Sequence, residues 1–373
     1  MHKIKICYLI VSPYYGGVVT VVSHLIEGLD KNKYEISLVF DSGYPEEDLR
    51  LKNAKLFPLR IRGRSFILDI FKLYRIFKKE KFDIVHSHNT KTHIIGIIVA
   101  FLARIPLKIC TIHEDLIGIL EKKKKNKVFF LYLYKTIFAL TDVIVCVSNS
   151  TLEKIKMLFF KKNVCVIRNG YDCKTHINKL NDIIPKDSTN KNIIITYLGR
   201  ITKEKGLHIL IAALELLIQK TDVTLQIIGG SYDDSYMKKI IELITKLDLR
   251  NIHFYGVLKD FSALLLRTDI VVVPSLMESM GYSILDAWCY KKAVIASDID
   301  GIPEVITNER DGLLFIHNNS ADLAQKLEYL IQKPDIRIRL GENGFRKLKE
   351  KYSAVNFVKN MEDIYLSGLC KRI

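Results

Sequence analysis

The chain has 373 residues, of which 49% are hydrophobic, and a net charge of +16. This length can bury more than one hydrophobic core, which excludes a single small domain and predicts two domains of ordinary size. The best candidate for a membrane span, residues 94–103, has about half of the length that a bilayer-crossing helix needs, so we predict no such helix.

The positive charge is concentrated in the first half of the chain. Residues 1–180 carry 31 Lys and Arg against 16 Asp and Glu, whereas residues 181–373 carry 26 against 25. A one-sided excess of cations suits a polyanionic partner, either a nucleic acid or the anionic face of a membrane. The charge alone does not distinguish these two partners.

The cysteines and the N-terminus indicate a cytoplasmic protein. The seven cysteines form no CxxC pair, and Cys7, Cys110, Cys146 and Cys165 lie inside apolar runs, as small buried hydrophobes do in a reducing compartment. We therefore expect no disulfide framework and no zinc site. A strand-like run directly follows Lys3 with no cleavage site after it, so the N-terminus is unlike a signal peptide.

Apolar runs alternate with longer amphipathic segments from one end of the chain to the other. This pattern predicts repeated β-α units that build parallel sheets. In the first half, the predicted strands cover residues 3–11, 35–40, 83–86, 107–112, 142–147 and 164–167. In the second half, they cover residues 193–198, 224–228, 252–255, 270–273, 293–296 and 312–315.

A polar segment, residues 172–192, interrupts the alternation and contains Pro185 and several asparagines, so we interpret it as a linker. We place an N-terminal domain at residues 1–180 and a C-terminal domain at residues 181–352. The chain ends in helical spacing without strands, and a terminal helix within residues 353–373 could pack back on the first domain.

In open parallel sheets, ligands bind beyond the carboxyl ends of the strands. Gly16 and Gly17 follow the first strand at a helix start, where backbone N–H groups can approach a phosphate, although a Gly-Gly turn is more often only a turn. His113 follows the strand that ends at residue 112, within reach of a ligand, although a core or capping histidine is the simpler interpretation. His86 and His88 share one strand face, but no third ligand stands at metal-like spacing, so we predict no metal site.

Two segments of the second half carry a stronger pattern. Arg200 lies in the loop after a predicted strand, and Lys205 lies in the first turn of the next helix. A cation there opposes the helix dipole, and a bound anion would remove this conflict; two solvated cations are the alternative. Glu278 and Asp286 flank a helix start near Gly281, so two carboxylates stand beside unpaired backbone N–H groups. This combination suits a sugar phosphate, and a plain helix start that favours acids is the alternative.

These residues resemble the retaining glycosyltransferases of family 4, which have the GT-B fold. Any one of the matching motifs would be weak, but together they occur in the family's order over nearly the whole chain. The matches are Gly16-Gly17-Val18 for the N-terminal glycine loop, Thr111, His113 and Asp115 for T-x-H-D, Asn169-Gly170 for a turn, Gly199-Arg200 with Lys205-Gly206 for G-R-x4-K-G, Glu278 with Asp286 for E-x7-E, and residues 301–305 for a further turn.

The sequence departs from the family's pattern at two places. The second acid of E-x7-E is Asp286, which is one methylene shorter than Glu, and Ser279 follows Glu278 where glycine is usual. Glu114 separates His113 from Asp115, so the acid that orients this histidine stays open.

The resemblance implies two Rossmann-like domains that face each other across a cleft, with the acceptor in the first domain and the donor in the second. The implied donor is a UDP- or GDP-linked nucleotide diphosphate sugar, with no cofactor and no metal. Arg200 and Lys205 would stabilise the charge that develops on the leaving diphosphate. Glu278 would bind hydroxyls of the transferred sugar, and His113 would contact this sugar near the reacting carbon. The implied donor-binding residues are Gly16, Gly17, Arg200, Lys205, Met280, Gly281, Tyr282 and Asp286.

A cationic patch in the first half offers a second binding surface, of which the expected members are Lys122, Lys123, Lys124, Lys125, Arg60, Arg62 and Arg64. The four lysines precede an aromatic run, residues 128–134. Cations beside aromatics suit a helix that lies on an anionic leaflet, where a lipid-linked acceptor would be found. A buried helix preceded by a solvated charge run is the alternative.

Other functions stay open at this point. A nucleotide-sugar epimerase or hydrolase of the same fold would show the same donor-binding residues. The charge also allows a non-enzymatic nucleic-acid-binding protein, but the chain has no recognised nucleic-acid-binding motif, so we expect no such partner. A dehydrogenase is disfavoured because the first β-α turn lacks G-x-G-x-x-G. Assembly of a surface polysaccharide, such as a capsule or lipopolysaccharide, is the usual setting for the family.

Overall fold

The computed structural model describes residues 3–11, 16–41, 53–59, 66–113, 116–122, 126–159, 163–173, 192–217, 223–231 and 233–371. The chain divides into two compact units. Unit 1 comprises Met1–Tyr171 and Tyr352–Ile373, and unit 2 comprises Asp172–Lys351.

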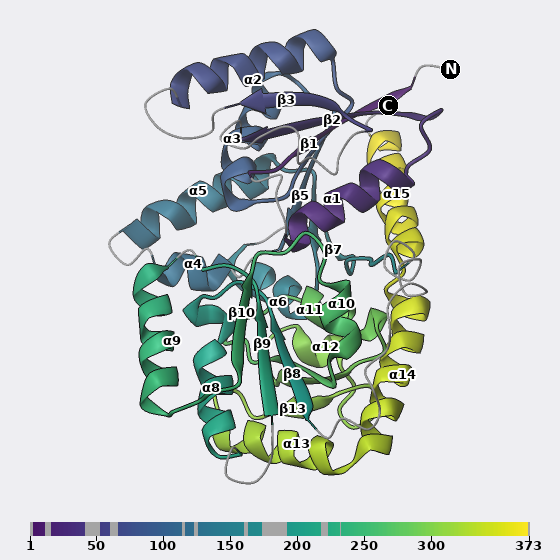
Figure 1. Ribbon diagram of the computed structural model, residues 1–373. Coiled ribbons are helices and arrows are strands. Elements are labelled where there is room, and N and C mark those ends of the chain that lie inside the picture. Colours follow the sequence, from purple (N-terminus) through teal and green to yellow (C-terminus); the bar gives the residue numbers. More distant parts are fainter. Residues whose placement is uncertain are drawn as a thin grey trace. The chain divides into compact units, whose positions relative to one another are not determined.

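Unit 1 is built on a parallel sheet (Figure 1). Its strands are β1 (Ile4–Leu9), β2 (Tyr34–Asp41), β3 (Lys55–Leu59), β4 (Ile84–Ser87), β5 (Leu107–Ile112), β6 (Val143–Cys146) and β7 (Val164–Val166). The described strands follow the order β3-β2-β1-β4-β5-β6-β7. The inner strands are apolar and almost wholly buried, as parallel strands covered on both faces must be.

Helices cover both faces of this sheet. They are α1 (Gly17–Gly28), α2 (Phe66–Glu80), α3 (Thr90–Leu102), α4 (Leu116–Lys122), α5 (Lys127–Leu140), α6 (Asn149–Leu158) and α15 (Ala354–Cys370). On one face, α3 packs between α2 and α5. Side chains such as Leu73, Phe77 and Val99 pack there against strand residues such as Leu9 and Val39.

The C-terminal helix α15 belongs to unit 1, although the helix before it in the chain lies in unit 2. It packs beside α1, and Figure 1 shows these two helices side by side in yellow and purple. Gly28 makes this approach possible, because an added Cβ would stand 2.7 Å from a methyl group of Val358. Glu362 accepts hydrogen bonds from Lys33 Nζ at 2.7 Å and from Tyr34 OH at 2.9 Å.

Unit 2 is built on a second parallel sheet. Its strands are β8 (Ile193–Leu198), β9 (Val223–Ile228), β10 (Ile252–Gly256), β11 (Ile270–Val273), β12 (Ala293–Ser297) and β13 (Leu313–Phe315), in the order β10-β9-β8-β11-β12-β13. The helical segments are the 3-10 turn η4 (Lys203–Lys205), α8 (Leu207–Glu215), α9 (Asp234–Lys246), α10 (Ser262–Arg267), α11 (Tyr282–Cys289), α12 (Ile302–Val305), α13 (Ser320–Gln332) and α14 (Pro334–Lys351).

The two sheets share one topology, which confirms the predicted pair of Rossmann-like domains. In each sheet the first strand lies between the second and the fourth, so the order reverses between β1 and β4 and between β8 and β11. At such a switch point, the loops leave the sheet in opposite directions and open a crevice at the carboxyl ends of the strands. The fold therefore directs attention to the residues after β1, β4, β8 and β11.

All twelve predicted strands are present, with ends that differ by at most two residues from the prediction. One strand, β3, was not predicted from the sequence, and its five residues include Pro58. Proline cannot donate to a sheet ladder, which argues against a central strand but is tolerated at an edge. β3 pairs only with β2 among the described strands.

No helix within the described ranges is long and apolar enough to cross a membrane.

Candidate functional site

The loops after β8 and β11 touch each other at the switch point of unit 2. Leu276 N donates to Glu204 O at 2.7 Å. Gly206 has φ +69°, and an added Cβ would stand 1.8 Å from the carbonyl oxygen of Pro274. Only glycine allows both this conformation and this approach. The last glycine of the G-R-x4-K-G segment thus allows the loop that carries Arg200 and Lys205 to pack closely against the loop that carries Glu278.

Lys205 and Glu278 form a direct ion pair between these two loops. Lys205 Nζ donates to Glu278 Oε2, and Ser275 Oγ donates to the same oxygen at 3.2 Å. The two charged side chains are 24% and 13% exposed, so the pair is screened from bulk water but still reachable. No described residue bonds to the second carboxylate oxygen, Oε1, which leaves it able to accept hydrogen bonds from a ligand.

The backbone of Glu278 is held by the turn that precedes α12. Glu278 N donates to Asp300 Oδ2 at 3.2 Å, and Gly301 N donates to Glu278 O at 3.1 Å. Gly301 is the first residue of the turn at residues 301–305 that matched the family pattern. This turn therefore fixes the position of the acidic residue whose side chain bonds Lys205.

Arg200 lies in the loop after β8 with an exposed side chain. Its carbonyl oxygen accepts a hydrogen bond from Tyr197 OH at 2.6 Å. Burial raises the pKa of Tyr197 well above its usual value, the Glu278 carboxylate raises it further, and the Arg200 guanidinium lowers it. Tyr197 therefore lies within the electrostatic influence of both charges.

Helix α11 starts beside this loop with an uncapped N-terminus. Gly281 is the N-cap residue, with φ +81° and no side-chain cap hydrogen bond. Met280 is buried, Tyr282 is the first helical residue, and Asp286 lies one turn further along. Burial and the Asp286 carboxylate raise the pKa of Tyr282 well above its usual value. The prediction of a helix start near Gly281 is confirmed, and its first N–H groups have no side-chain cap.

Of the four predicted charged residues, the structure brings Lys205 and Glu278 into direct contact. Arg200 lies after β8, in the same connection as Lys205, and Asp286 lies in helix α11, which follows Glu278. All four come from the carboxyl ends of the adjacent strands β8 and β11, or from the helix after β11.

In unit 1, Gly16 and Gly17 stand where the sequence places them, at the start of α1. Gly16 has φ +148°, and α1 has no side-chain cap and no acid in its first turn. An added Cβ at Gly16 would meet no described residue within 4 Å, and its backbone conformation itself favours glycine. An uncapped helix start without acids is suited to an anion.

His113 follows β5 and is paired with a residue that the sequence analysis did not connect with it. His113 Nε2 and His88 Nδ1 are 3.2 Å apart, and the two rings stack with centroids 5.5 Å apart. Burial lowers the pKa of His113 to about 3, so the ring is neutral at physiological pH. The two acids that we considered as its partners, Glu114 and Asp115, lie outside the described residues.

Within the described part of the chain, no group of three His, Cys, Asp or Glu side chains could hold a metal ion. The side chains of the expected cationic patch are not among those that the structure describes. They are those of Lys122, Lys123, Lys124, Lys125, Arg60, Arg62 and Arg64.

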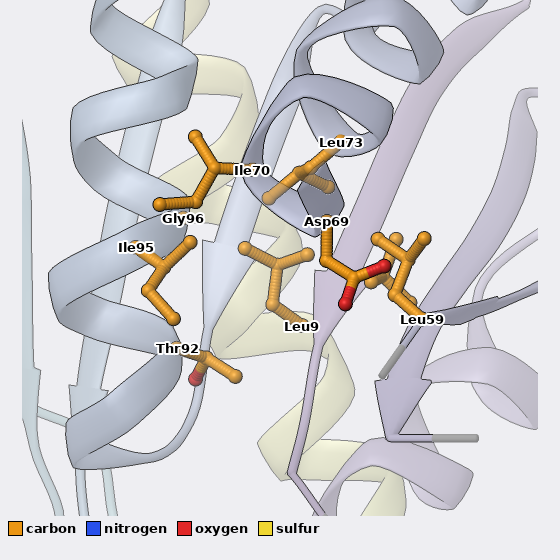
Figure 2. A pocket seen from close by; sticks show the side chains of 9 residues that line it. Leu9, Leu59, Asp69, Ile70, Leu73, Thr92, Ile95 and Gly96 are labelled. Carbon is orange, nitrogen blue, oxygen red and sulfur yellow. The ribbon is translucent and has the colours of Figure 1, made fainter. Parts of the chain in front are cut away.

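A small pocket lies between α2 and α3, at the carboxyl ends of β1 and β3 (Figure 2). Its walls are mostly aliphatic, and the Asp69 carboxylate is among the side chains that line it. Lys72 Nζ donates to Asp69 Oδ1 at 3.3 Å, whereas the buried Oδ2 has no hydrogen-bond partner in the described part of the chain. The enclosed volume of about 20 Å³ is room for one water molecule, not for a sugar ring. We therefore do not place the acceptor there.

Two doubly wound parallel sheets, with a cation–carboxylate pair at one switch point and a glycine helix start at the other, define a protein of the nucleotide-binding α/β class. Comparison with known families narrows this class. Residues 15–175 match Glycosyltransferase Family 4, and residues 179–347 match Glycosyl transferases group 1. The chain belongs to glycosyltransferase family 4, and it is an enzyme that uses nucleotide sugars.

Similar proteins cover the whole chain. A protein of Escherichia coli, UDP-Gal:alpha-D-GlcNAc-diphosphoundecaprenol alpha-1,3-galactosyltransferase, is 28% identical over 98% of this chain and 97% of its own. The capsular polysaccharide biosynthesis glycosyltransferase CapM of Staphylococcus aureus is 27% identical over 91% and 92%. The crystal structure of Anabaena Alr3699/HepE in complex with UDP-glucose has a TM-score of 0.82 at 19% identity, and covers 98% of this chain and 100% of that one. This likeness confirms the GT-B fold.

Proposed function

We propose that the protein is a retaining, metal-independent hexosyltransferase that moves a sugar from a UDP-sugar to a hydroxyl of a glycan or lipid-linked acceptor. The observation that carries this proposal is the Lys205–Glu278 pair at the β8/β11 switch point. It puts a cation that can neutralise a diphosphate beside a carboxylate that can bind sugar hydroxyls.

The pair has a role in each state of the site. Without donor, Lys205 and Glu278 neutralise each other. When the donor binds, Lys205 forms an ion pair with the diphosphate in place of Glu278, and the Glu278 carboxylate becomes able to accept hydrogen bonds from the sugar. Arg200, which is exposed, closes on the same diphosphate. The two cations then replace the charge that a metal ion would supply.

The reaction breaks the bond between the anomeric carbon and the diphosphate oxygen, and the electron pair stays on the diphosphate. Arg200 and Lys205 stabilise this developing charge. The acceptor oxygen bonds to the anomeric carbon on the face that the diphosphate leaves, which retains the configuration. The acceptor's proton goes to the leaving phosphate oxygen, so no protein base is needed.

The rest of the donor is bound by helix starts. The N–H groups of Met280, Gly281 and Tyr282, just before and at the start of α11, face a phosphate or the sugar, and Asp286 accepts from the ribose hydroxyls. Gly16 and Gly17 at the start of α1 offer N–H groups of the same kind to a phosphate. HepE was solved with UDP-glucose, and the Escherichia coli relative is named for UDP-Gal, so we favour UDP over GDP.

The acceptor is proposed to be lipid-linked and to bring the enzyme to the cytoplasmic face of a membrane. The name of the Escherichia coli relative contains a diphosphoundecaprenol acceptor. In unit 1, the exposed side of α2 presents the apolar side chains of Leu68 and Phe71 beside the cations Lys72, Arg75 and Lys78. Apolar side chains next to cations are typical of helices that lie on anionic membranes.

Co-sedimentation with vesicles tests this attachment. A variant with Lys72, Arg75 and Lys78 replaced by Ser should bind anionic vesicles more weakly than the wild type, by roughly 100-fold at about 1 kcal/mol for each of the three cations. Replacement of the exposed unit 2 residues Lys238 and Lys246 by Ser is the control. Equal binding by all three proteins would remove the membrane proposal.

Product analysis tests the activity itself. Purified protein is incubated with UDP-sugars, with and without a lipid-linked sugar acceptor, and the anomeric configuration of the product is read by NMR. Transfer that retains the configuration and survives a chelator is expected. Isomerised donor or free sugar without acceptor would indicate an epimerase or a hydrolase, and retention of a nucleic acid on a filter at physiological salt would indicate the binding alternative.

A further inference from the structure

A cluster of buried polar rings lies at the β1/β4 switch point of unit 1. The histidine cluster, as we call it, consists of Tyr8, His86, His88, His93, Thr111, His113 and Tyr365. Except for His113, which is partly exposed, each member is at most 3% exposed. The members come from strands β1, β4 and β5, from helices α3 and α15, and from the residues that follow β4 and β5.

His86 is fully hydrogen-bonded and anchors the cluster. Its Nδ1 is 2.9 Å from Tyr365 OH, and its Nε2 is 2.7 Å from Thr111 Oγ1. Tyr365 OH is also 3.2 Å from Tyr8 OH. His86 therefore ties the end of β5, two residues before His113, to helix α15.

His88 lies between His86 and His113 and contacts both. Its ring contacts the ring of His86 in a tilted arrangement, with centroids 4.0 Å apart and an interplanar angle of 34°, and it stacks on the ring of His113 with an interplanar angle of 24°. Its Nδ1 bonds His113 Nε2 at 3.2 Å. Its Nε2 is buried and has no hydrogen-bond partner among the described residues.

The unpartnered nitrogen decides where the hydrogens lie. Burial, and next the other histidines, lowers the pKa of His88 well below its usual value, so the ring is neutral and carries one hydrogen. A hydrogen on Nε2 would be a buried donor without an acceptor, at a cost of about 1–3 kcal/mol. The hydrogen is therefore on Nδ1, and His88 donates to His113 Nε2.

This assignment determines the state of His113. The His113 ring is also neutral, and its Nε2 accepts the hydrogen bond, so its own hydrogen is on Nδ1. No side chain among the described residues pairs with this N–H. We propose that His88 is a positioning residue that holds His113 in one orientation and one tautomer, with the Nδ1–H turned toward a sugar oxygen. The inference rests on the proposed transfer reaction and on the contact with the transferred sugar that the family resemblance implies for His113.

The tautomer of His113 determines its chemical role in the transfer reaction. A histidine that presents N–H to the ligand, and whose other nitrogen is occupied by His88, cannot take a proton from the acceptor. His113 then acts as a hydrogen-bond donor to the sugar and not as a general base. This agrees with a reaction in which the leaving phosphate accepts the acceptor's proton.

The first test reads the tautomer without any activity. The ten histidines are labelled with ¹⁵N, and two-bond proton–nitrogen spectra report which ring nitrogen of each carries hydrogen; His113→Gln and His88→Asn assign the two signals. We expect hydrogen on Nδ1 of both rings. Hydrogen on Nε2 of His113 would overturn the proposal, whether or not the protein transfers sugar.

The second test is a double-mutant cycle in the transfer assay. His88→Phe keeps a stacked ring without the hydrogen bond, and His88→Asn retains an amide donor near the position of Nδ1. We expect kcat to fall by about 10- to 100-fold for His88→Phe, with the donor KM changed less than about twofold, and to recover in part for His88→Asn. On a His113→Ala background, His88→Phe should have less than about a twofold effect, because the residue that it positions is gone.

Equal effects of His88→Phe in the two backgrounds would contradict the positioning role, since a merely structural residue acts independently of His113. Should His88→Phe not fold, the comparison of His88→Asn in both backgrounds replaces it. His208→Asn, a half-buried histidine of unit 2, controls for the loss of any imidazole and should leave kcat unchanged. Absence of transfer by the wild type would instead reject the proposed function and leave the tautomer result standing.

Discussion

The most informative single change is Lys205→Met, which keeps the aliphatic stem and removes the charge. With side chains 24% and 13% exposed, the Lys205–Glu278 pair is partly solvated, so its loss should reduce the free energy of unfolding by only about 1 kcal/mol. For a unit of this size, that is about 2–4 °C in Tm. Glu278 retains the hydrogen bond from Ser275 Oγ at 3.2 Å, which limits the effect on the loop.

The expected effect on catalysis is much larger. Removing one preorganised group that faces the leaving charge costs about 100- to 1,000-fold in kcat, which corresponds to roughly 3–4 kcal/mol. The assay measures the initial rate of UDP release with donor and acceptor saturating, together with Tm by calorimetry. A fall in kcat of less than about tenfold would refute the assignment of Lys205 to the diphosphate.

Lys347→Met is the matched control within the same unit. Lys347 Nζ bonds Asp311 Oδ2 at 2.8 Å, and these side chains are 13% and 4% exposed. Removing the cation leaves a buried carboxylate without its counter-charge, so the loss of stability should be larger, about 3–5 kcal/mol. The kcat of the folded protein should not change. Lys205→Met is thus expected to lose much activity and little stability, whereas Lys347→Met is expected to lose much stability and no activity.

Three further predictions concern stability. Gly206→Ala should lower the urea midpoint strongly, because its Cβ would stand 1.8 Å from a backbone oxygen. Gly256→Ala, at φ +66° with no described residue within 4 Å of the added Cβ, should cost only about 1 kcal/mol. Similar urea midpoints for the two variants would contradict the clash at Gly206. Tyr365→Phe should cost about 1–3 kcal/mol, because His86 Nδ1 loses its partner, and an unchanged Tm would show that this hydrogen bond is not needed. Burial lowers the pKa of the four histidines of the cluster, to about 3 for His93 and His113. Below pH 6.5 the unfolded chain binds protons that the folded chain excludes, so stability is complete above pH 6.5 and falls toward pH 3. His93 and His113 should each contribute a loss of about 2 kcal/mol at pH 5, and equal Tm at pH 7.5 and pH 5 would refute this.

The inner strands could be predicted from the sequence because each is a local apolar run, and burial on both faces requires such a run whatever the neighbours are. β3 was missed because Pro58 is compatible only with an edge position, and the edge is a property of the whole sheet. The helix start at Gly281 was also local, since glycine marks a backbone with positive φ.

The sequence alone determined the family, the strand–helix alternation and the charged residues near the donor, because motif spacing and periodicity are encoded within a few turns of chain. Only the tertiary structure showed that Lys205 bonds Glu278, 73 positions away, and that His88, set aside as half of a metal pair, bonds His113. Tyr365 belongs to this cluster although it lies 279 positions after His86. Such contacts arise when parallel strands bring distant carboxyl ends to one edge, and no local pattern in the chain records which side chains then meet.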